Sequence, residues 1–296
     1  MASVSMPAPA TYLTSNQRYR TRRRLTIALA NAVLIAVVLV SLYPFAMLVM
    51  NSFKSDSEIV SNPAGLPIHW TLGSYGAIFQ YHGGMWRNFL NSILIATIST
   101  AVAVLLTSMA AFAFAKYRFR GRDLIFALLL ATLMVPGEIT IPPLYIMFAR
   151  LHWLNTYQVQ ILPTITSVFG VFLMRQYMRG VPTALLDAAR VDGAGHWQLY
   201  WHIMVPSAAP VLGAFAILHF LGVWNSYLWP LVVVTKAALQ PIMVVLPNLT
   251  DPHIGFLPVW GTIMAGVVLS TLPIVLVFVA FQEKFISSVV VGAIKE

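Results

Sequence analysis

The sequence predicts an all-α membrane protein with six transmembrane helices and both termini in the cytoplasm. Hydrophobic residues make up 59% of the 296 residues and charged residues only 9%, whereas a soluble domain has about 25% charged residues. A helix that crosses a membrane needs about 20 mainly apolar residues, and six stretches provide them. The predicted spans are residues 25–50, 88–115, 124–149, 157–178, 205–234 and 258–281.

The first span follows a polar and basic start. Residues 1–17 are small and polar, so we expect them to be disordered. The run RYRTRRR then completes a basic cytoplasmic tail of residues 1–24. We interpret this run as a topology anchor rather than as an arm that binds nucleic acid. The apolar run 25–50 is too long for a signal peptide, whose apolar part has about 7–15 residues.

Polar segments separate the later spans, and prolines interrupt one of them. The first two connections contain KSDSEIVSNPAG and KYRFRGRD, and TDPHIG precedes the last span. Pro136, Pro142 and Pro143 interrupt the third span, because proline cannot donate a helical hydrogen bond. The carbonyls freed in this way are tolerated at membrane depth only where they face protein or a water-filled cavity.

The distribution of lysine and arginine gives the orientation. If the N-terminus is cytoplasmic, only Lys54, Arg87, Arg150 and Lys236 lie outside, so 14 of the 18 lysines and arginines lie inside. Cytoplasmic loops carry this excess of positive charge. The same orientation places residues 180–206 in the second cytoplasmic connection.

Residues 180–206 have the sequence signals of a helix, a turn and a second helix. Pro182 suits the start of a helix and Gly193 the position just past its end, which predicts a helix from Thr183 to Val191 and a second helical run up to Pro206. Such a segment is much longer than an ordinary connection of about 2–8 residues between helices. We therefore expect a docking surface for another protein rather than a simple connector.

One face of the predicted helix is suited to close contact. Leu185, Ala188, Ala189 and Asp192 are three or four residues apart and share this face. Small side chains let another surface approach, and a carboxylate at the edge, from Asp187 or Asp192, can pair with an incoming arginine.

The sequence lacks the motifs of cysteine chemistry, nucleotide binding, metal binding and nucleophilic catalysis. The chain has no cysteine, which excludes disulfides, thiolate metal sites and cysteine nucleophiles. We find no phosphate-binding loop of the G-x-x-x-x-G-K-[ST] type and no histidine spacing typical of a metal site. No nucleophile motif is present either, so we expect neither an enzyme nor a metalloprotein.

The segment 180–206 resembles the EAA loop of inward-transporting ABC permeases. The resemblance rests on Asp187-Ala188-Ala189, on Asp192-Gly193-Ala194, and on the Ile203, Val205 and Pro206 that follow. Asp187 stands where the family usually has Glu, and Val205 where it usually has Leu. Over residues 25–296 the runs NSFKSDSEIVSNPAGLP, MVPGEITIPPLY, FLGVWNSYLWPLVV and FQEKFISSVVVGAIKE are similar to the carbohydrate-uptake branch, specifically to its shorter maltose-type subunit.

The resemblance implies a permease subunit of an ATP-driven importer for a sugar or oligosaccharide in a bacterial inner membrane. Its implied partners are a second, different permease subunit, a cytoplasmic ATPase dimer and an extracytoplasmic binding protein, besides membrane lipid. ATP would be used by the ATPase, with no cofactor on this chain and no nucleic acid bound. The implied contacts with the ATPase are Asp187, Ala188, Ala189, Asp192, Gly193, Ala194 and Pro206.

Four polar or aromatic residues are candidates for the substrate pathway. Trp224, Asn225 and Tyr227 in the fifth span offer an aromatic face and hydrogen bonds, which suit a sugar. Glu138, an acid within the third span, either lines the pathway or is a packed structural acid. The connection 236–258 either contacts the binding protein or caps its own helices.

Two alternatives remain open. One is an ABC permease of the same fold for another solute, such as a glycerophosphodiester or a polyamine. The other is an ion-coupled secondary transporter, which predicts inverted repeats and several acids near the membrane midplane; this sequence shows one such acid and no visible repeat.

Overall fold

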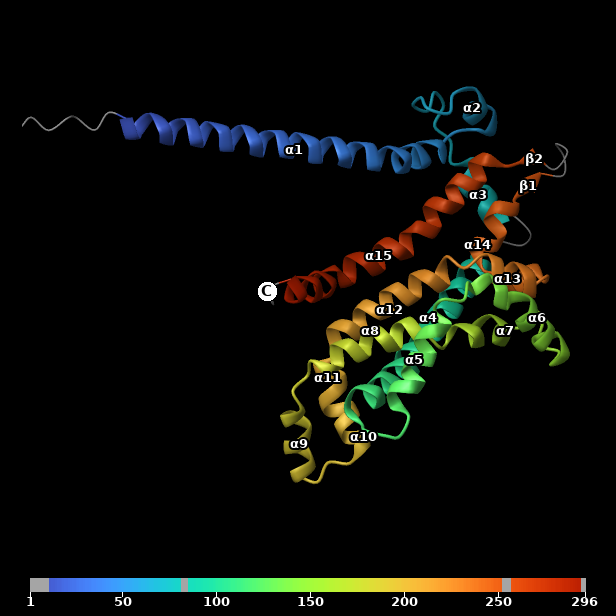
Figure 1. The fold of residues 1–296 in the computed structure, drawn as a ribbon. Helices are drawn as coiled ribbons and strands as arrows, with labels where there is room; N and C mark the ends of the chain where they lie inside the picture. The colour runs from blue at the N-terminus through green and yellow to red at the C-terminus, as the bar shows by residue number, and fades with distance from the viewer. Residues whose placement is uncertain (1–10, 81–84, 252–256, 294–296) are drawn as a thin grey trace, which may run out of the picture.

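The computed structural model describes residues 11–80, 85–251 and 257–293, and the side chains of 23–80, 85–249 and 259–279. Most of the described chain is helical (Figure 1). Its strands are a pair of two residues each, β1 (Thr250–Asp251) and β2 (Leu257–Pro258), which pair antiparallel. The prediction of an all-α protein is confirmed in this architecture.

Three helices and three bent helix pairs have the length and composition of membrane spans. The single helices are Arg23–Asn51 within α1 (Thr11–Asn51), α4 (Trp86–Lys116), and Trp260–Val279 within α15 (Trp260–Ala293). The bent pairs are Arg122–Thr132 with Gly137–Arg150, Tyr157–Thr164 with Val168–Arg179, and His196–Ser207 with Ala209–Trp224. If each bent pair is one span, the described chain has up to six, as the sequence predicts.

The remaining helical elements form the bent pairs or lie in the connections between the spans. Their bounds, in chain order, are α2 (Asp56–Ser61), α3 (Gly73–Gln80), α5 (Arg122–Thr132), η2 (Gly137–Thr140), α6 (Ile141–Arg150), α7 (Tyr157–Ile161), η3 (Leu162–Thr164), α8 (Val168–Arg179), α9 (Thr183–Val191), α10 (His196–Gln198), η4 (Leu199–Met204), α11 (Val205–Ser207), α12 (Ala209–Trp224), α13 (Leu228–Val233), η5 (Ala237–Leu239), α14 (Ile242–Val245) and η6 (Leu246–Asn248).

The first helix begins earlier than the sequence predicts. We expected residues 1–17 to be disordered, but α1 already includes Thr11, so this expectation is wrong for residues 11–17; residues 1–10 lie outside the described part. Adding a residue to an existing helix is much easier than nucleating a new one, and no proline or glycine follows Pro9 before the apolar run. The helix therefore continues through the polar residues.

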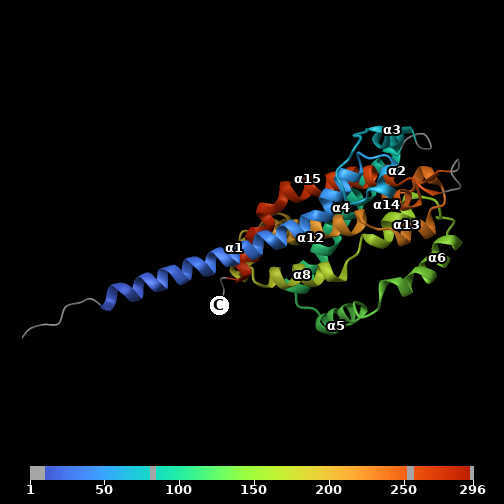
Figure 2. The same cartoon turned by 90° about the horizontal axis from the view of Figure 1, so that it is seen from above.

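The third predicted span, 124–149, is not one continuous helix. α5 and the segment of η2 and α6 meet at 94°. Pro136 precedes η2, and Pro142 and Pro143 begin α6, so the backbone around the bend lacks several N–H donors. The interruption that the prolines predict is confirmed, and it takes the form of a right-angled bend. α5 packs against α8 and lies at the lower edge of the molecule in the view of Figure 2.

The largest hydrophobic cluster joins α4, α8, η4 and α12. Met174, Met178, Leu199, Met204 and Phe215 are buried in it. α8 approaches its neighbours closely at Gly170, where a Cβ would overlap the Phe215 ring and lie 2.8 Å from Thr107 Cγ2. A second cluster, between α3, α4, α12, α14 and α15, includes Trp224 and Leu246. The two clusters hold α4 and α12 together along much of their length.

Candidate functional site

Residues 180–206, which we call the coupling loop, form a helix-turn-helix at one end of the bundle (Figure 1). α9 has the predicted bounds Thr183–Val191 and follows Pro182. Gly193 adopts a left-handed conformation with φ of 84°, which a residue with a Cβ adopts only at a cost. This turn reverses the chain into the second helical arm.

Hydrogen bonds fix the turn and the two ends of α9. The N–H of Ala194 donates to Ala189 O at 2.9 Å, and the N–H of Gly195 donates to Gln198 Oε1 at 2.8 Å. Ahead of α9, Lys116 Nζ donates to Val181 O at 2.6 Å. The conformation of the coupling loop is therefore determined within this chain.

The outer surface of the coupling loop exposes large apolar side chains. Val191 is 88% exposed, Trp197 60% and Leu185 50%, whereas Leu186 is 1% exposed and belongs to the core. Asp187 and Arg190 of α9 form an ion pair of 2.7 Å. Large exposed apolar side chains near charged ones are a feature of interaction sites.

The second arm connects this surface to the membrane helices without a break until Ser207. α10, η4 and α11 form one helical stretch that meets α12 at 78°. η4 is a π-helix. This conformation is rare in proteins, and where it occurs it is often at a functional site. Within it, Tyr200 is 2% exposed and its hydroxyl lies 2.6 Å from Ser108 Oγ of α4. The coupling loop is thus joined to α12 by the chain and to α4 by a buried hydrogen bond.

A shallow depression beside the turn is lined by residues that the EAA resemblance predicts as ATPase contacts and by residues of the second arm. Ala189, Asp192, Gly193 and Ala194 line one part of it, as the EAA resemblance suggests. Ile203 of the second arm, which is also part of the EAA resemblance, lines it as well. Two further lining residues of the second arm were not identified from the sequence: Gln198 and His202. Their helical spacing of three residues from Gly195 and Leu199 is the signal that could have identified them. Pro206 lies one turn further along, in α11.

The candidates for the substrate pathway are not in one place. Trp224 is 1% exposed, stacks on Phe220 at 5.8 Å between ring centroids, and belongs to the second hydrophobic cluster. Asn225 and Tyr227 follow the end of α12 and are exposed. Glu138 is exposed in η2 at the bend of the third span. No hydrogen bond among the described residues joins Glu138 to the other three, and their role in a pathway stays a prediction.

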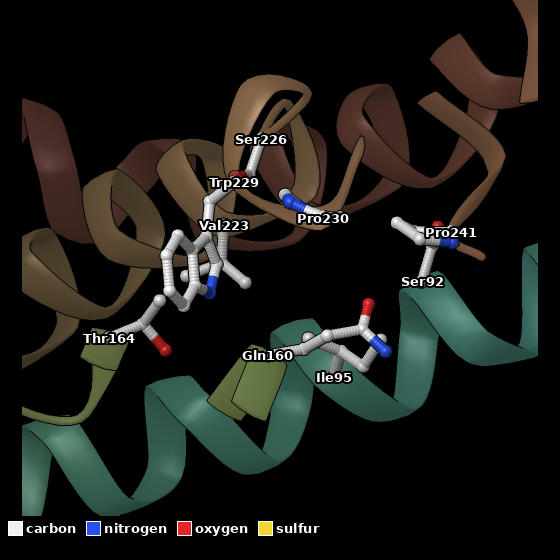
Figure 3. Close-up of a pocket in the computed structure, with 9 residues that line it drawn as sticks. All are labelled: Ser92, Ile95, Gln160, Thr164, Val223, Ser226, Trp229, Pro230 and Pro241. Carbon is white, nitrogen blue, oxygen red and sulfur yellow. The ribbon is translucent and has the colours of Figure 1, made fainter. Parts of the chain in front are cut away.

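A small cavity adjoins these fifth-span residues (Figure 3). Its walls come from α4, α7, η3, α12, α13 and the loop after α13: Ser92, Ile95, Gln160, Thr164, Val223, Ser226, Trp229, Pro230 and Pro241. Gln160 is 2% exposed, and its Oε1 has no partner among the described residues. The Trp229 indole N–H donates to Val159 O at 2.9 Å. The cavity has room for about one water molecule, not for a sugar.

The described part of the connection 236–258 packs on its own helices. Asn88 Nδ2 donates to Ala237 O and Gln240 O at 2.9 and 2.8 Å, and the N–H of Ile242 donates to Ser92 Oγ at 2.9 Å. This contact matches the capping alternative for residues 236–249. Residues 252–256, where a contact with a binding protein was also expected, lie outside the described part.

In the part of the chain that the structure describes, no group of three or more acidic, histidine or cysteine side chains could hold a metal ion.

Comparisons with known proteins agree with this architecture. The family model described as "Binding-protein-dependent transport system inner membrane component" matches residues 70–291. The chain is 37% identical over 262 residues to the arabinooligosaccharides transport system permease protein AraQ of Halalkalibacterium halodurans, covering 88% of this chain and 93% of that protein. It is 30% identical to the sn-glycerol-3-phosphate transport system permease protein UgpE of Yersinia pestis, covering 91% and 97%.

The fold is also similar to that of a solved transporter. A chain of a bacterial ABC transporter involved in the import of the acidic polysaccharide alginate superposes with a TM-score of 0.78. The two chains are 23% identical, and the match covers 89% of this chain and 98% of the other. At this identity the likeness concerns the arrangement of the helices.

Proposed function

Because this chain belongs to the binding-protein-dependent transport system inner membrane components, we propose that it is the permease subunit of an ATP-driven importer for a sugar or oligosaccharide. In this role the coupling loop receives the closing motion of an ATPase dimer and passes it to the membrane helices. The chain is a multi-pass membrane protein and a transport component rather than an enzyme.

The structure of the coupling loop is the observation that carries the proposal. Its outer surface exposes Leu185, Val191 and Trp197, while its inner side packs through Leu186 and Tyr200 into the core between α4, α8 and α12. A movement of the outer surface is therefore passed to α4, α8 and α12 through side chains that are already in contact. A simple connector would have no need of either feature.

The proposed partners follow from the missing phosphate-binding loop and from the docking residues of the coupling loop. The sequence has no phosphate-binding loop, so ATP is bound and hydrolysed by another chain. The docking residues are Asp187, Ala188, Ala189, Asp192, Gly193, Ala194 and Pro206. A second, different permease subunit completes the pathway across the bacterial inner membrane, and an extracytoplasmic binding protein delivers the substrate.

The substrate class rests on the relatives. AraQ, whose name states arabinooligosaccharide transport, is 37% identical to this chain, and this similarity favours an oligosaccharide. UgpE, whose name states sn-glycerol-3-phosphate transport, is 30% identical, so a phosphorylated glycerol derivative is the second candidate. Trp224, Asn225, Tyr227 and Glu138 are the residues of this chain that we assign to the pathway.

The coupling role is tested by comparing a substitution of Asp187 with a substitution of Arg190, its ion-pair partner. Asp187→Lys reverses the charge of the docking surface and should reduce uptake at least tenfold, the effect of about 1.4 kcal/mol, while the ATPase keeps hydrolysing ATP. Arg190→Ala is the matched control, because it removes the ion pair of 2.7 Å and leaves the Asp187 carboxylate free to bind the ATPase. Equal uptake in the two variants, measured in proteoliposomes with the complete transporter, would exclude Asp187 as a docking residue.

The substrate is tested with the same proteoliposomes and the binding protein. Uptake of labelled arabinooligosaccharide that depends on ATP, with no uptake of sn-glycerol 3-phosphate or of a polyamine, is the expected result. Uptake of sn-glycerol 3-phosphate alone would replace the sugar by the second candidate and leave the importer function intact.

A further inference from the structure

An excess of positive charge surrounds the turn between α4 and α5, residues 117–121, at the same end of the bundle as the coupling loop (Figure 1). Arg118, Arg120 and Arg122 lie on or directly after this turn, and Arg175 approaches it from α8. Asp123 is the acid that pairs with them: its carboxylate accepts from Arg122 Nε at 3.0 Å, and its Oδ1 lies 3.7 Å from Arg175 Nη2. One carboxylate cannot neutralise four guanidinium groups, so the site carries surplus positive charge.

The turn forms an open hollow with basic walls. Arg118, Phe119, Gly121, Arg122, Asp123 and Leu124 line it. Gly121 has φ of 79° and precedes α5 without any side chain that caps the helix. A negatively charged group is favoured at the N-terminal end of a helix. The hollow thus combines guanidinium groups with the N-terminal end of α5.

The side chain of Arg175 fixes one wall of this region. It is buried with 7% exposure, its guanidinium carbon lies 3.8 Å from the centre of the Phe126 ring, and its Nε donates to Phe114 O at 3.3 Å. A cation held over an aromatic ring keeps its charge in a defined place. Part of the positive potential is therefore rigid, whereas the exposed Arg118 is free to approach a ligand.

An apolar surface begins where the basic hollow ends. Leu124, Ile125 and Leu128 on α5 are 66%, 44% and 61% exposed, and α5 belongs to a candidate membrane span. Phe119 at the rim is 42% exposed, as is usual for aromatic residues at the boundary between membrane and water. A charged hollow that continues into a hydrocarbon-facing helix matches a molecule with a charged head and apolar chains.

We propose that the hollow at residues 118–124 binds the phosphate head group of an anionic phospholipid, whose acyl chains lie along α5. Basic pockets beside membrane helices bind such head groups on the cytoplasmic side. A soluble anion would use the arginines alone, but the exposed leucines and isoleucine of α5 would gain nothing from it. The site is separate from the coupling loop and requires neither the ATPase nor the transported substrate.

Lipid retention by the purified full chain tests the proposal. We would add phosphatidylglycerol, or phosphatidylcholine as the head group without net charge, to the chain in detergent and count bound lipids by native mass spectrometry. Arg118→Gln combined with Arg122→Gln should weaken retention of phosphatidylglycerol about 10- to 30-fold, since each basic residue near an anionic lipid contributes about 1 kcal/mol. The control, Arg87→Gln with Arg150→Gln, removes the same charge from exposed positions that do not line the hollow and should change retention less than about threefold.

Three results would overturn the proposal. They are equal retention of the two lipids by the unaltered chain, an equal loss in both double variants, and displacement of phosphatidylglycerol by an excess of inorganic phosphate, which would indicate a site for a free anion. Because Arg122 also donates to Tyr117 O at 3.4 Å, its loss could disturb the turn. The single variant Arg118→Gln, at an exposed position without such a bond, should still lower retention of phosphatidylglycerol several-fold, and unchanged retention in it contradicts the site.

Discussion

Two long connections of this protein lie at opposite ends of the bundle (Figure 1). They differ in whether their large apolar side chains are exposed or buried. The coupling loop exposes Leu185, Val191 and Trp197. The segment 235–249, which we call the packed loop, buries Ile242 and Leu249 instead and accepts hydrogen bonds from α4. Both segments contain large apolar side chains, so their presence alone does not decide whether a connection docks a partner. What decides it is whether the loop's apolar side chains find partners within the chain.

The largest effect is expected where α4 holds the packed loop. Asn88→Ala with Asn91→Ala removes four hydrogen bonds of 2.8–3.1 Å to Ala237, Ala238 and Gln240. The loss should destabilise the protein by about 2–4 kcal/mol, because unpaired buried polar groups are costly. Thermal melting of the purified chain measures it. The exposed Asn225→Ala should change stability by less than about 0.5 kcal/mol; a comparable loss in that control would mean that the amides of α4 have no special role.

The second prediction concerns the contact between the packed loop and α15. A Cβ at Gly266 would overlap the Leu246 side chain, so Gly266→Ala should destabilise the protein by about 1–3 kcal/mol through overpacking. Gly213 on α12 has no atom within 4 Å of an added Cβ, and Gly213→Ala should leave the melting temperature unchanged or raise it. If both variants melt alike, the packed loop does not press closely on α15.

In the coupling loop a glycine is needed for its backbone angle, not for space. Gly193 has φ of 84° and no atom within 4 Å of an added Cβ. Gly193→Ala should therefore cost about 1–2 kcal/mol from the left-handed conformation alone. Gly195→Ala, at φ of −75°, is the control and should be nearly neutral. Limited proteolysis at the coupling loop reports the difference, and equal cleavage of the two variants would contradict it.

The smallest effect is expected for the exposed ion pair on α9. Asp187 and Arg190 have side chains 61% and 43% exposed, and exposed pairs of this kind contribute about 0–1 kcal/mol. Arg190→Ala should shift the melting temperature by no more than the error of the measurement, at low and at high salt. A clear loss of stability that salt abolishes would show that the pair organises the coupling loop.

The sequence predicts local features of this fold better than distant contacts. Pro182 and Gly193 act on their own neighbours, and α9 has the predicted bounds; the prolines around Glu138 likewise predict the break in the third span. The packing of residues 236–249 depends on Asn88, which is 149 residues from Ala237. No pattern along the chain identifies such a partner.

The sites show the same division. The candidate residues Ala189 to Ala194 surround one depression because they are close in sequence. Trp224 has the chemistry of a sugar-binding residue, but the structure buries it beside Phe220 and Leu246, where neighbours from other helices decide its environment. The early start of α1 at Thr11 has a third cause, the ease of extending a helix that already exists.

The second arm of the coupling loop meets α12 at a bend of 78°, so a small rotation at this bend displaces the far end of α12. α12 has 16 residues and is therefore about 24 Å long at about 1.5 Å per residue. A rotation of about 5° around the bend would displace its far end by about 2 Å over that length. The far end carries Trp224 and adjoins the small cavity of Figure 3, so a slight tilt at the coupling-loop end becomes a larger displacement beside this cavity.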